Sequence, residues 1–235
     1  MLKMFNFFKR QKPIVLNCYT SDKRVYDYAS IAPAFKYTPK WFKELPKDSQ
    51  NKNMRQCFGL LDLFKRSIVI PMWCDLDVEL HENGAFTWVF HDGQTNAEVH
   101  GYQQFSGWVD SSSHYHMKIL SPWVFTCDDD VYFQWTQATW GLNDLFDFVS
   151  PPAVVEYKNQ TSTHINLLMN AKRKKLELKF GTPLVMITPL TERKFVFKTH
   201  LVSEDEMKKI DKRMVGVKRG AYSASIKAKK CPFGG

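Results

Sequence analysis

Residues 76–90 read Leu-Asp-Val-Glu-Leu-His-Glu-Asn-Gly-Ala-Phe-Thr-Trp-Val-Phe, and this stretch decides the fold class. Large apolar residues recur at every second position on both sides of Asn83-Gly84, which is the period of a half-buried strand. An Asn-Gly pair between two such runs is the strongest short signal for a hairpin, because both turn positions need positive φ. The stretch therefore predicts an antiparallel hairpin within a β-meander.

Short apolar runs between Pro, Gly and Asp residues predict strands along most of the remaining chain. These runs lie at 14–19, 116–120, 123–127, 131–139, 153–157, 164–169, 176–180, 184–188 and 194–199. Apolar residues at spacings of three and four predict a helix near 54–66. Ser203 and Glu206 match the capping box that begins a helix. Strands and helices do not alternate as they do in parallel-sheet proteins.

We therefore predict a mainly β protein, an antiparallel β-sandwich or jelly roll with a few peripheral helices. Its segments are a basic and aromatic N-terminal segment (1–13), one β-rich domain (14–202) with helices near 40–66, a capped helix (203–215) and a basic tail (216–235). Phe133 and Trp135 share one strand face, and we expect them to fill the core. The alternative is that such rings stack on exposed bases.

Composition excludes several classes of protein. Of the 235 residues, 44% are apolar and 24% are charged, which fits neither a disordered chain nor a membrane bundle. No apolar run approaches the roughly 18 residues of a spanning helix, so we expect no transmembrane segment. Five cysteines without a C-x-x-C spacing argue against a disulfide framework and a zinc ribbon.

Positive charge is concentrated near the C-terminus. Residues 172–235 carry 17 Lys or Arg against six acidic residues, whereas residues 1–171 carry 16 against 18. A cationic tail of this kind binds phosphates or an anionic surface, or it only keeps the terminus solvated. The residues predicted to bind nucleic acid or another anion are Lys212, Arg213, Lys218, Arg219, Lys227, Lys229 and Lys230.

Five short segments carry a resemblance to a known family. They are Trp41–Pro46, Arg55–Asp62, Ile70–Asp75, Ile119–Trp123 and Phe180–Val185 with Pro189. The chain resembles, over residues 14–210, a family of functionally uncharacterised proteins encoded by tailed phages, mainly marine ones, and by some bacteria. The resemblance implies a viral product that works in the bacterial host cytoplasm or in the virion. The step Gly181-Thr182-Pro183 into an apolar strand is also similar to cupin-like β-barrels, as an analogy of fold.

His114-Tyr115-His116 is the sharpest candidate for a metal site. Alternate residues of a strand share one face, so His114 and His116 can share iron (Fe) or another divalent transition metal, as in cupin-type oxygenases. Residues 117–127 contain no acidic ligand, and a third ligand would have to come from His164, His200 or a distant acid. The alternative is an exposed strand face without a cofactor.

The chain contains no G-x-S-x-G, no G-x-x-x-x-G-K-[ST] and no G-x-G-x-x-G motif. We therefore expect a non-catalytic binding or assembly protein that acts on a host protein or a virion component. A metal-dependent oxygenase using the histidine pair and a nucleic-acid-binding protein using the basic tail are the alternatives. The sequence leaves the oligomeric state and the identity of the partner open.

Overall fold

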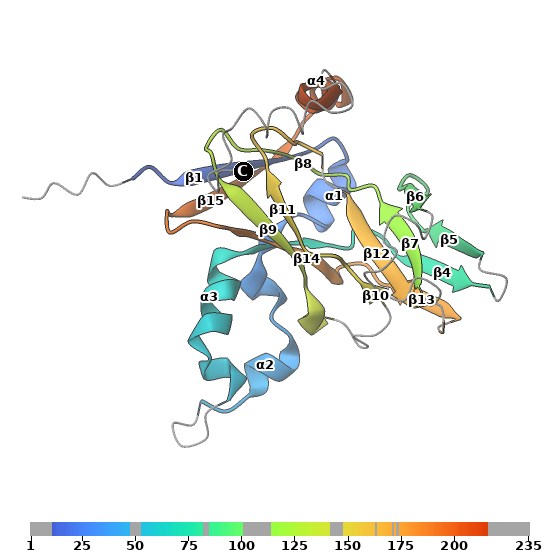
Figure 1. Cartoon of the computed structure of the whole chain (residues 1–235), viewed down its shortest axis with the longest axis horizontal. Helices are drawn as coiled ribbons and strands as arrows, with labels where there is room; N and C mark the ends of the chain where they lie inside the picture. Colours follow the sequence, from blue (N-terminus) through green and yellow to red (C-terminus); the bar gives the residue numbers. More distant parts are fainter. Residues whose placement is uncertain are drawn as a thin grey trace, which may run out of the picture.

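The structure is a computed structural model that describes residues 11–47, 53–81, 85–100, 114–141, 148–162, 164–170, 172 and 174–215. Over these residues the chain is mainly β, with four sheets and a few helices (Figure 1). Each sheet has two different edge strands, so none of the four closes on itself within the described chain. The prediction of a mainly β protein with few helices is confirmed.

The largest sheet has the strand order β11-β9-β14-β3-β2. Its strands are β11 (Ala153–Glu156), β9 (Tyr132–Gln137), β14 (Pro183–Pro189), β3 (Ile68–Pro71) and β2 (Ala32–Pro33). Every residue of β3 is buried, because Ile68 and Ile70 face the main core and Val69 faces a second cluster on the other side. A strand that is covered on both faces carries a continuous apolar run.

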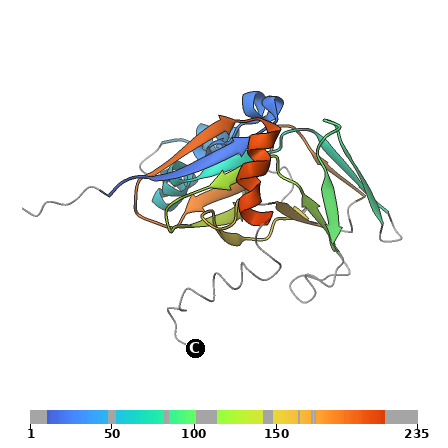
Figure 2. The same ribbon diagram turned by 90° about the horizontal axis from the view of Figure 1, so that it is seen from above.

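The terminal strands of the domain form a three-stranded sheet of order β15-β1-β8. Its strands are β1 (Ile14–Thr20), β8 (Val124–Thr126) and β15 (Phe195–Leu201). β1 and β15 run parallel over their whole length, and Figure 2 shows them side by side. This pair corrects the prediction of purely antiparallel pairing. The two strands are far apart in the sequence, so no local strand–helix–strand pattern predicts their parallel pairing.

The stretch that decides the fold class forms β4 (Leu76–Leu80) and β5 (Phe86–Phe90), which pair antiparallel with Leu76 opposite Phe90. The hairpin prediction is confirmed for these two strands, whereas Asn83-Gly84 lies outside the described residues. The prediction of a meander is wrong, because the third strand of this sheet is not the next strand in the sequence. It is β13 (Lys175–Leu178), which lies about a hundred residues after β4 and pairs with it.

The fourth sheet has the order β10-β12-β7-β6. Its strands are β10 (Phe148–Val149), β12 (Ile165–Asn170), β7 (His114–Ile119) and β6 (Ala97–His100). All of its strand pairs are antiparallel. One face of this sheet joins the main core, since Met117, Ile165 and Leu167 are completely or almost completely buried.

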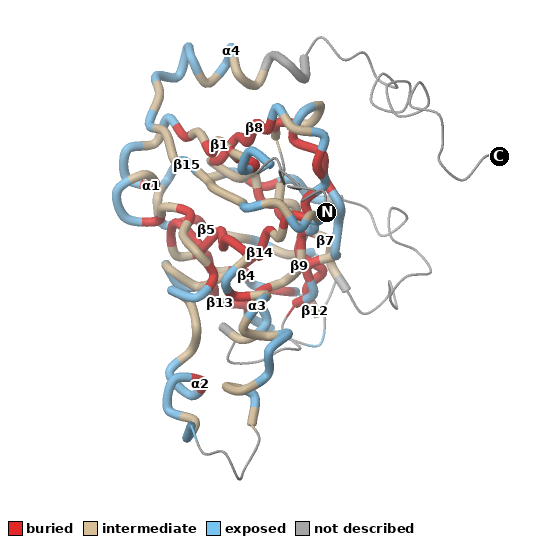
Figure 3. The backbone as a smooth tube through the Cα atoms, turned by 90° about the vertical axis from the view of Figure 1, so that its left-hand side faces the viewer, coloured by how far each residue is buried: buried red, intermediate tan, exposed pale blue. Residues whose placement is uncertain are grey.

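One cluster of buried side chains receives residues from all four sheets and forms the main core. Phe133 and Trp135 belong to it, which confirms their prediction as core residues. The Trp135 indole N–H donates to the Tyr157 hydroxyl at 2.5 Å, so the polar atom of the buried Trp135 has a partner. Figure 3 shows that burial follows the strands, whereas the helices remain partly exposed.

The helices lie at the periphery. They are α1 (Lys23–Tyr28), α2 (Lys40–Glu44), α3 (Phe58–Arg66) and α4 (Glu204–Val215), with 3-10 turns η1 (Ala34–Tyr37), η2 (Met54–Gln56) and η5 (Thr139–Gly141). The described residues from η1 to α3 (34–47 and 53–66) form a projection that we call the helical lobe. It lies at the opposite end of the molecule from α4 (Figure 1).

α4 begins with the reciprocal hydrogen bonds of a capping box. The Ser203 backbone N–H donates to the Glu206 carboxylate at 2.9 Å, and the Glu206 N–H donates to Ser203 Oγ at 3.3 Å. Asp211 links α4 to the rest of the domain, because its carboxylate accepts hydrogen bonds from the hydroxyls of Thr161 and Ser162. Among the described helices, none is both long and apolar enough to span a bilayer.

Candidate functional site

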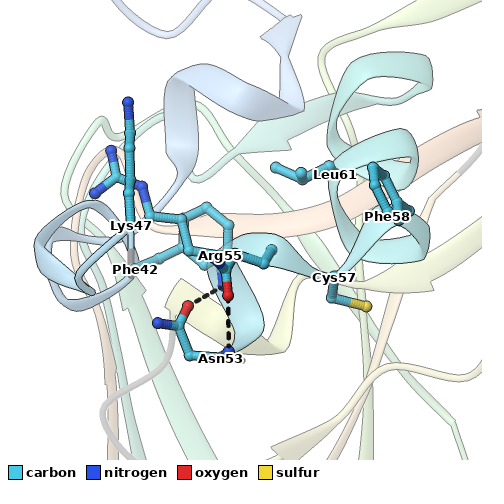
Figure 4. Close-up of a pocket in the computed structure, with 8 residues that line it drawn as sticks. Phe42, Lys47, Asn53, Arg55, Cys57, Phe58 and Leu61 are labelled. Atoms are coloured by element: carbon cyan, nitrogen blue, oxygen red, sulfur yellow. Dashed lines mark hydrogen bonds between the residues drawn. The ribbon is translucent and has the colours of Figure 1, made fainter. Parts of the chain in front are cut away.

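The main hollow of the helical lobe is an apolar pocket of about 1000 Å³ between α2, η2 and α3. We call it the lobe pocket. Figure 4 shows the side chains of its walls, which come from α2, η2 and α3 and from the described residues beside them. The lining residues are Phe42, Lys47, Asn53, Arg55, Gln56, Cys57, Phe58 and Leu61. Its volume is at the upper end of the range for small-ligand pockets.

Local sequence fixes the ends of the short elements around this pocket. α2 begins directly after Pro39 and ends at Leu45, whose extended backbone is the conformation that the following Pro46 favours. η2 begins at Asn53, whose side chain accepts the Arg55 N–H at 3.0 Å, while the Asn53 N–H donates to Gln56 Oε1 at 3.3 Å. Local sequence therefore marks the end of α2 and the start of η2.

Two polar side chains tie the opposite walls of the pocket together. Arg55 Nη1 donates to the backbone oxygens of Lys43 and Leu45, at 2.6 Å and 2.8 Å. Asn53 Nδ2 donates to the backbone oxygen of Pro46 at 2.8 Å. These bonds satisfy carbonyl groups at the end of α2 that have no partner within the helix. The spacing between α2 and η2 is consequently held by hydrogen bonds as well as by packing.

Three aromatic rings pack in a row, in edge-to-face contact, where the lobe meets the large sheet. Phe64 lies between Phe42 and Trp140, with ring centroids 5.4 Å and 4.9 Å apart. Trp140 is anchored by a hydrogen bond from its indole N–H to the backbone oxygen of Tyr37 at 3.1 Å. Phe42 and Phe64 are buried in a cluster that is separate from the main core and covers the outer face of β3 and β14. The lobe is thus a small packing unit of its own.

The lobe also carries large apolar side chains that are exposed to solvent. Phe58 is 88% exposed although it is the first residue of α3, and Met54 is 54% exposed. Met54 begins η2 and Phe58 begins α3, so the stripe predicted near 54–66 is divided between two elements, and Leu61 and the buried Phe64 follow in α3. Exposed large apolar side chains beside a hollow mark interaction surfaces. Only the inner half of the predicted stripe packs against the protein itself.

The electrostatic character of the lobe is basic. Its described residues include seven Lys or Arg and two acidic residues, Glu44 and Asp62. Lys40 pairs with Glu44 at 3.6 Å and Arg66 pairs with Asp62 at 3.5 Å, so the two acids are already used within their own helices. The described residues provide no acidic partner for Lys36, Lys43, Lys47 or Lys65.

The predicted metal pair lies in β7, away from the lobe. His116 faces the polar side of its sheet, where its Nε2 is 2.9 Å from Asn166 Oδ1. The side chain of His114 lies outside the described residues. Strand register places position 100 of β6 directly opposite His116, which sequence spacing does not reveal. The described side chains contain no group of three His, Cys, Asp or Glu residues arranged for a metal ion, and the metal site stays a prediction.

His164, named as a possible third ligand, lies next to β12 and lines a cleft of about 350 Å³ with Lys118 and Asn166. Burial, followed by the positive charge of Lys118, lowers the pKa of His164. Its Nδ1 is buried and has no hydrogen-bond partner among the described residues. The other possible third ligand, His200, instead stacks on Tyr19 and contacts Asn17 in the sheet of β1 and β15.

The predicted anion-binding residues fall at the edge of the described chain. Lys212 and Arg213 belong to α4, but their side chains are outside the described residues. The remaining five, Lys218, Arg219, Lys227, Lys229 and Lys230, lie wholly outside them. The prediction that this tail binds nucleic acid therefore stays untested. α4, which precedes this tail in the sequence, lies at the far end of the molecule from the helical lobe (Figure 1).

Sequence reasoning did not single out the lobe pocket. The available signal was the apolar stripe of Met54, Phe58, Leu61 and Phe64, combined with the surplus of lysine in the same segment. The stripe predicts one face of a helix near 54–66, and in the structure its outer residues Met54 and Phe58 are exposed. Comparisons of the chain with protein-family models, curated proteins and solved structures give no match.

Proposed function

We propose that this protein is a non-catalytic binding or assembly protein that docks an apolar segment of a partner protein in the lobe pocket. The partner is a host protein or a virion component, and the protein works in the bacterial cytoplasm or in the virion. The observation that carries the proposal is the combination of a pocket of about 1000 Å³ with the 88% exposed Phe58 at its wall.

Two properties of the site support a docking function over a catalytic one. The polar side chains Asn53 and Arg55 in the pocket wall are hydrogen-bonded to the backbone of the lobe, which is the use expected of groups that shape a surface. The exposed Phe58 lies on α3, a regular element that is tied to the body by the contact of Phe64 with Trp140. A preorganised surface loses little conformational entropy on binding.

Site-specific crosslinking tests this function. A photoreactive phenylalanine derivative replaces Phe58 in one variant and Phe180 in another; both positions are exposed, and Phe180 lies just after β13, outside the lobe. We expect discrete protein adducts in a host extract from position 58 and none of the same size from position 180. The adducts disappear when Leu61→Asp is added. Identical adducts from both positions, or none from position 58, contradict the proposal.

The finer description of the fold belongs to the same proposal. We infer a sandwich or jelly roll of the cupin-like kind, and the support is that all four sheets contribute to one buried cluster. The oxygenase with His114 and His116 and the nucleic-acid-binding tail remain alternatives, and no described contact favours either over docking.

A further inference from the structure

We propose that the segment docked in the lobe pocket is acidic, with Asp or Glu residues flanking one or more large apolar side chains. This inference rests on the docking function proposed above and names the chemistry of the partner. The apolar side chains fill the pocket beside Phe42 and Leu61, and the carboxylates meet the lysines around it.

The first evidence for an acidic partner is the positive charge next to the pocket. Lys47 lines the pocket, and Lys43 is an exposed residue of α2, the helix that forms one wall. Neither lysine has an acidic partner among the described residues. The acids of the lobe, Glu44 and Asp62, are both ion-paired to its own cations. A surface of one sign beside an apolar pocket selects partners of the opposite sign and repels those of the same sign.

The chain's own terminal segments do not fit this surface. Residues 1–10 contain two lysines, one arginine and no acid, and residues 216–235 contain five Lys or Arg and no acid. Both segments therefore have the same sign of charge as the lobe, and electrostatic repulsion disfavours their docking. Neither terminal segment is therefore the complementary one, and we expect that segment in another molecule. Exposed aromatic and apolar side chains distinguish this site from a purely ionic surface, because a carboxylate alone does not occupy an apolar pocket.

Selection from a random peptide library displayed on yeast tests the inference without assuming a sequence. The bait is the full chain, and the counter-selection uses Phe58→Ser, which changes an exposed residue and leaves the packed side of α3 intact. We expect enriched peptides to combine Asp or Glu with Leu, Phe, Trp or Tyr. Their position is read from protection of the exposed Cys57 thiol against alkylation, in a Cys231→Ser background, since Cys18, Cys74 and Cys127 are buried.

Charge variants then test the role of the lysines. Lys43→Glu combined with Lys47→Glu is expected to weaken the selected peptides by about tenfold, and added salt is expected to weaken them too. The matched control is Lys194→Glu combined with Lys198→Glu, which makes the same change in net charge at exposed residues outside the lobe. Replacing Asp and Glu by Asn and Gln in the peptide is expected to give a similar loss.

Three other results would contradict the acidic partner, the docking function or both. Neutral or basic peptides that protect Cys57 would overturn the acidic partner and leave the docking function standing. Absence of enrichment over Phe58→Ser would overturn both. Protection of Cys57 by vesicles of anionic phospholipid or by single-stranded RNA, but not by the peptides, would replace the protein partner with a membrane surface or a nucleic acid.

Discussion

Phe64→Ala is the substitution that tests most directly whether the helical lobe is a separate packing unit. Phe64 is 3% exposed and contacts both Phe42 and Trp140 edge to face. Removal of a buried phenylalanine side chain costs about 3–5 kcal/mol, which includes the cavity it leaves. Each lost aromatic pair contributes about 0.5–1.5 kcal/mol beyond buried area, so the upper half of the range is expected.

The loss should be concentrated in the lobe, because the cluster around Phe64 is distinct from the main core. At 1.4 kcal/mol per factor of ten, about 4 kcal/mol accelerates amide exchange in α2 and α3 roughly a thousandfold, or to the unprotected rate. Hydrogen–deuterium exchange followed by mass spectrometry measures this on peptides from each element. Peptides from β1 and β9 provide the internal reference, since the buried side chains of these strands belong to the main core and not to the cluster around Phe64.

Phe58→Ala is the matched control. It removes the same side chain from the same helix at an exposed position, so the free energy of unfolding should change by only about 0.5 kcal/mol. The reasoning is refuted if α3 exchanges at the wild-type rate in Phe64→Ala, or if Phe58→Ala has an equal effect. Equal loss of protection in β9 would show that the lobe and the body unfold together.

Three further predictions concern the body of the fold. Tyr157→Phe leaves the buried Trp135 indole N–H without an acceptor and should lower the free energy of unfolding by about 1–3 kcal/mol in urea titrations. Asp211→Ala removes the acceptor of the Ser162 hydroxyl, so limited proteolysis should cleave α4 faster while the sheets stay protected. Burial lowers the pKa of His164 in the folded state, so the unfolded chain binds the proton first as pH falls below about 6.5 and stability decreases; His164→Gln should flatten this dependence.

Local features of the chain were predictable because their causes are local. The alternation in residues 76–90 gives β4 and β5 their buried faces, and a two-strand hairpin needs no distant partner to set its register. The capping box at Ser203 and Glu206 works by contacts three residues apart. Helical spacing near 54–66 likewise appears in the structure as η2 and α3.

Long-range pairing was not predictable from the same patterns. β1 lies parallel to β15 and β13 adds to the β4–β5 hairpin, although each pair is separated by most or much of the domain. Many partners satisfy the hydrophobic pattern of one strand equally well, and the choice among them depends on how the sheets share a core. The run Ile68–Pro71 was missed as a strand because burial on both faces removes the alternation by which a strand is recognised.

For the candidate site, sequence patterns predicted helices near 40–66 and an apolar stripe at 54–66. The contact of Phe64 with Trp140, the exposure of Phe58 and the pocket between α2, η2 and α3 follow from the tertiary structure alone. The physical reason is that helical periodicity states which residues share a face, whereas the extent of that face which is covered depends on neighbours that are distant in the sequence.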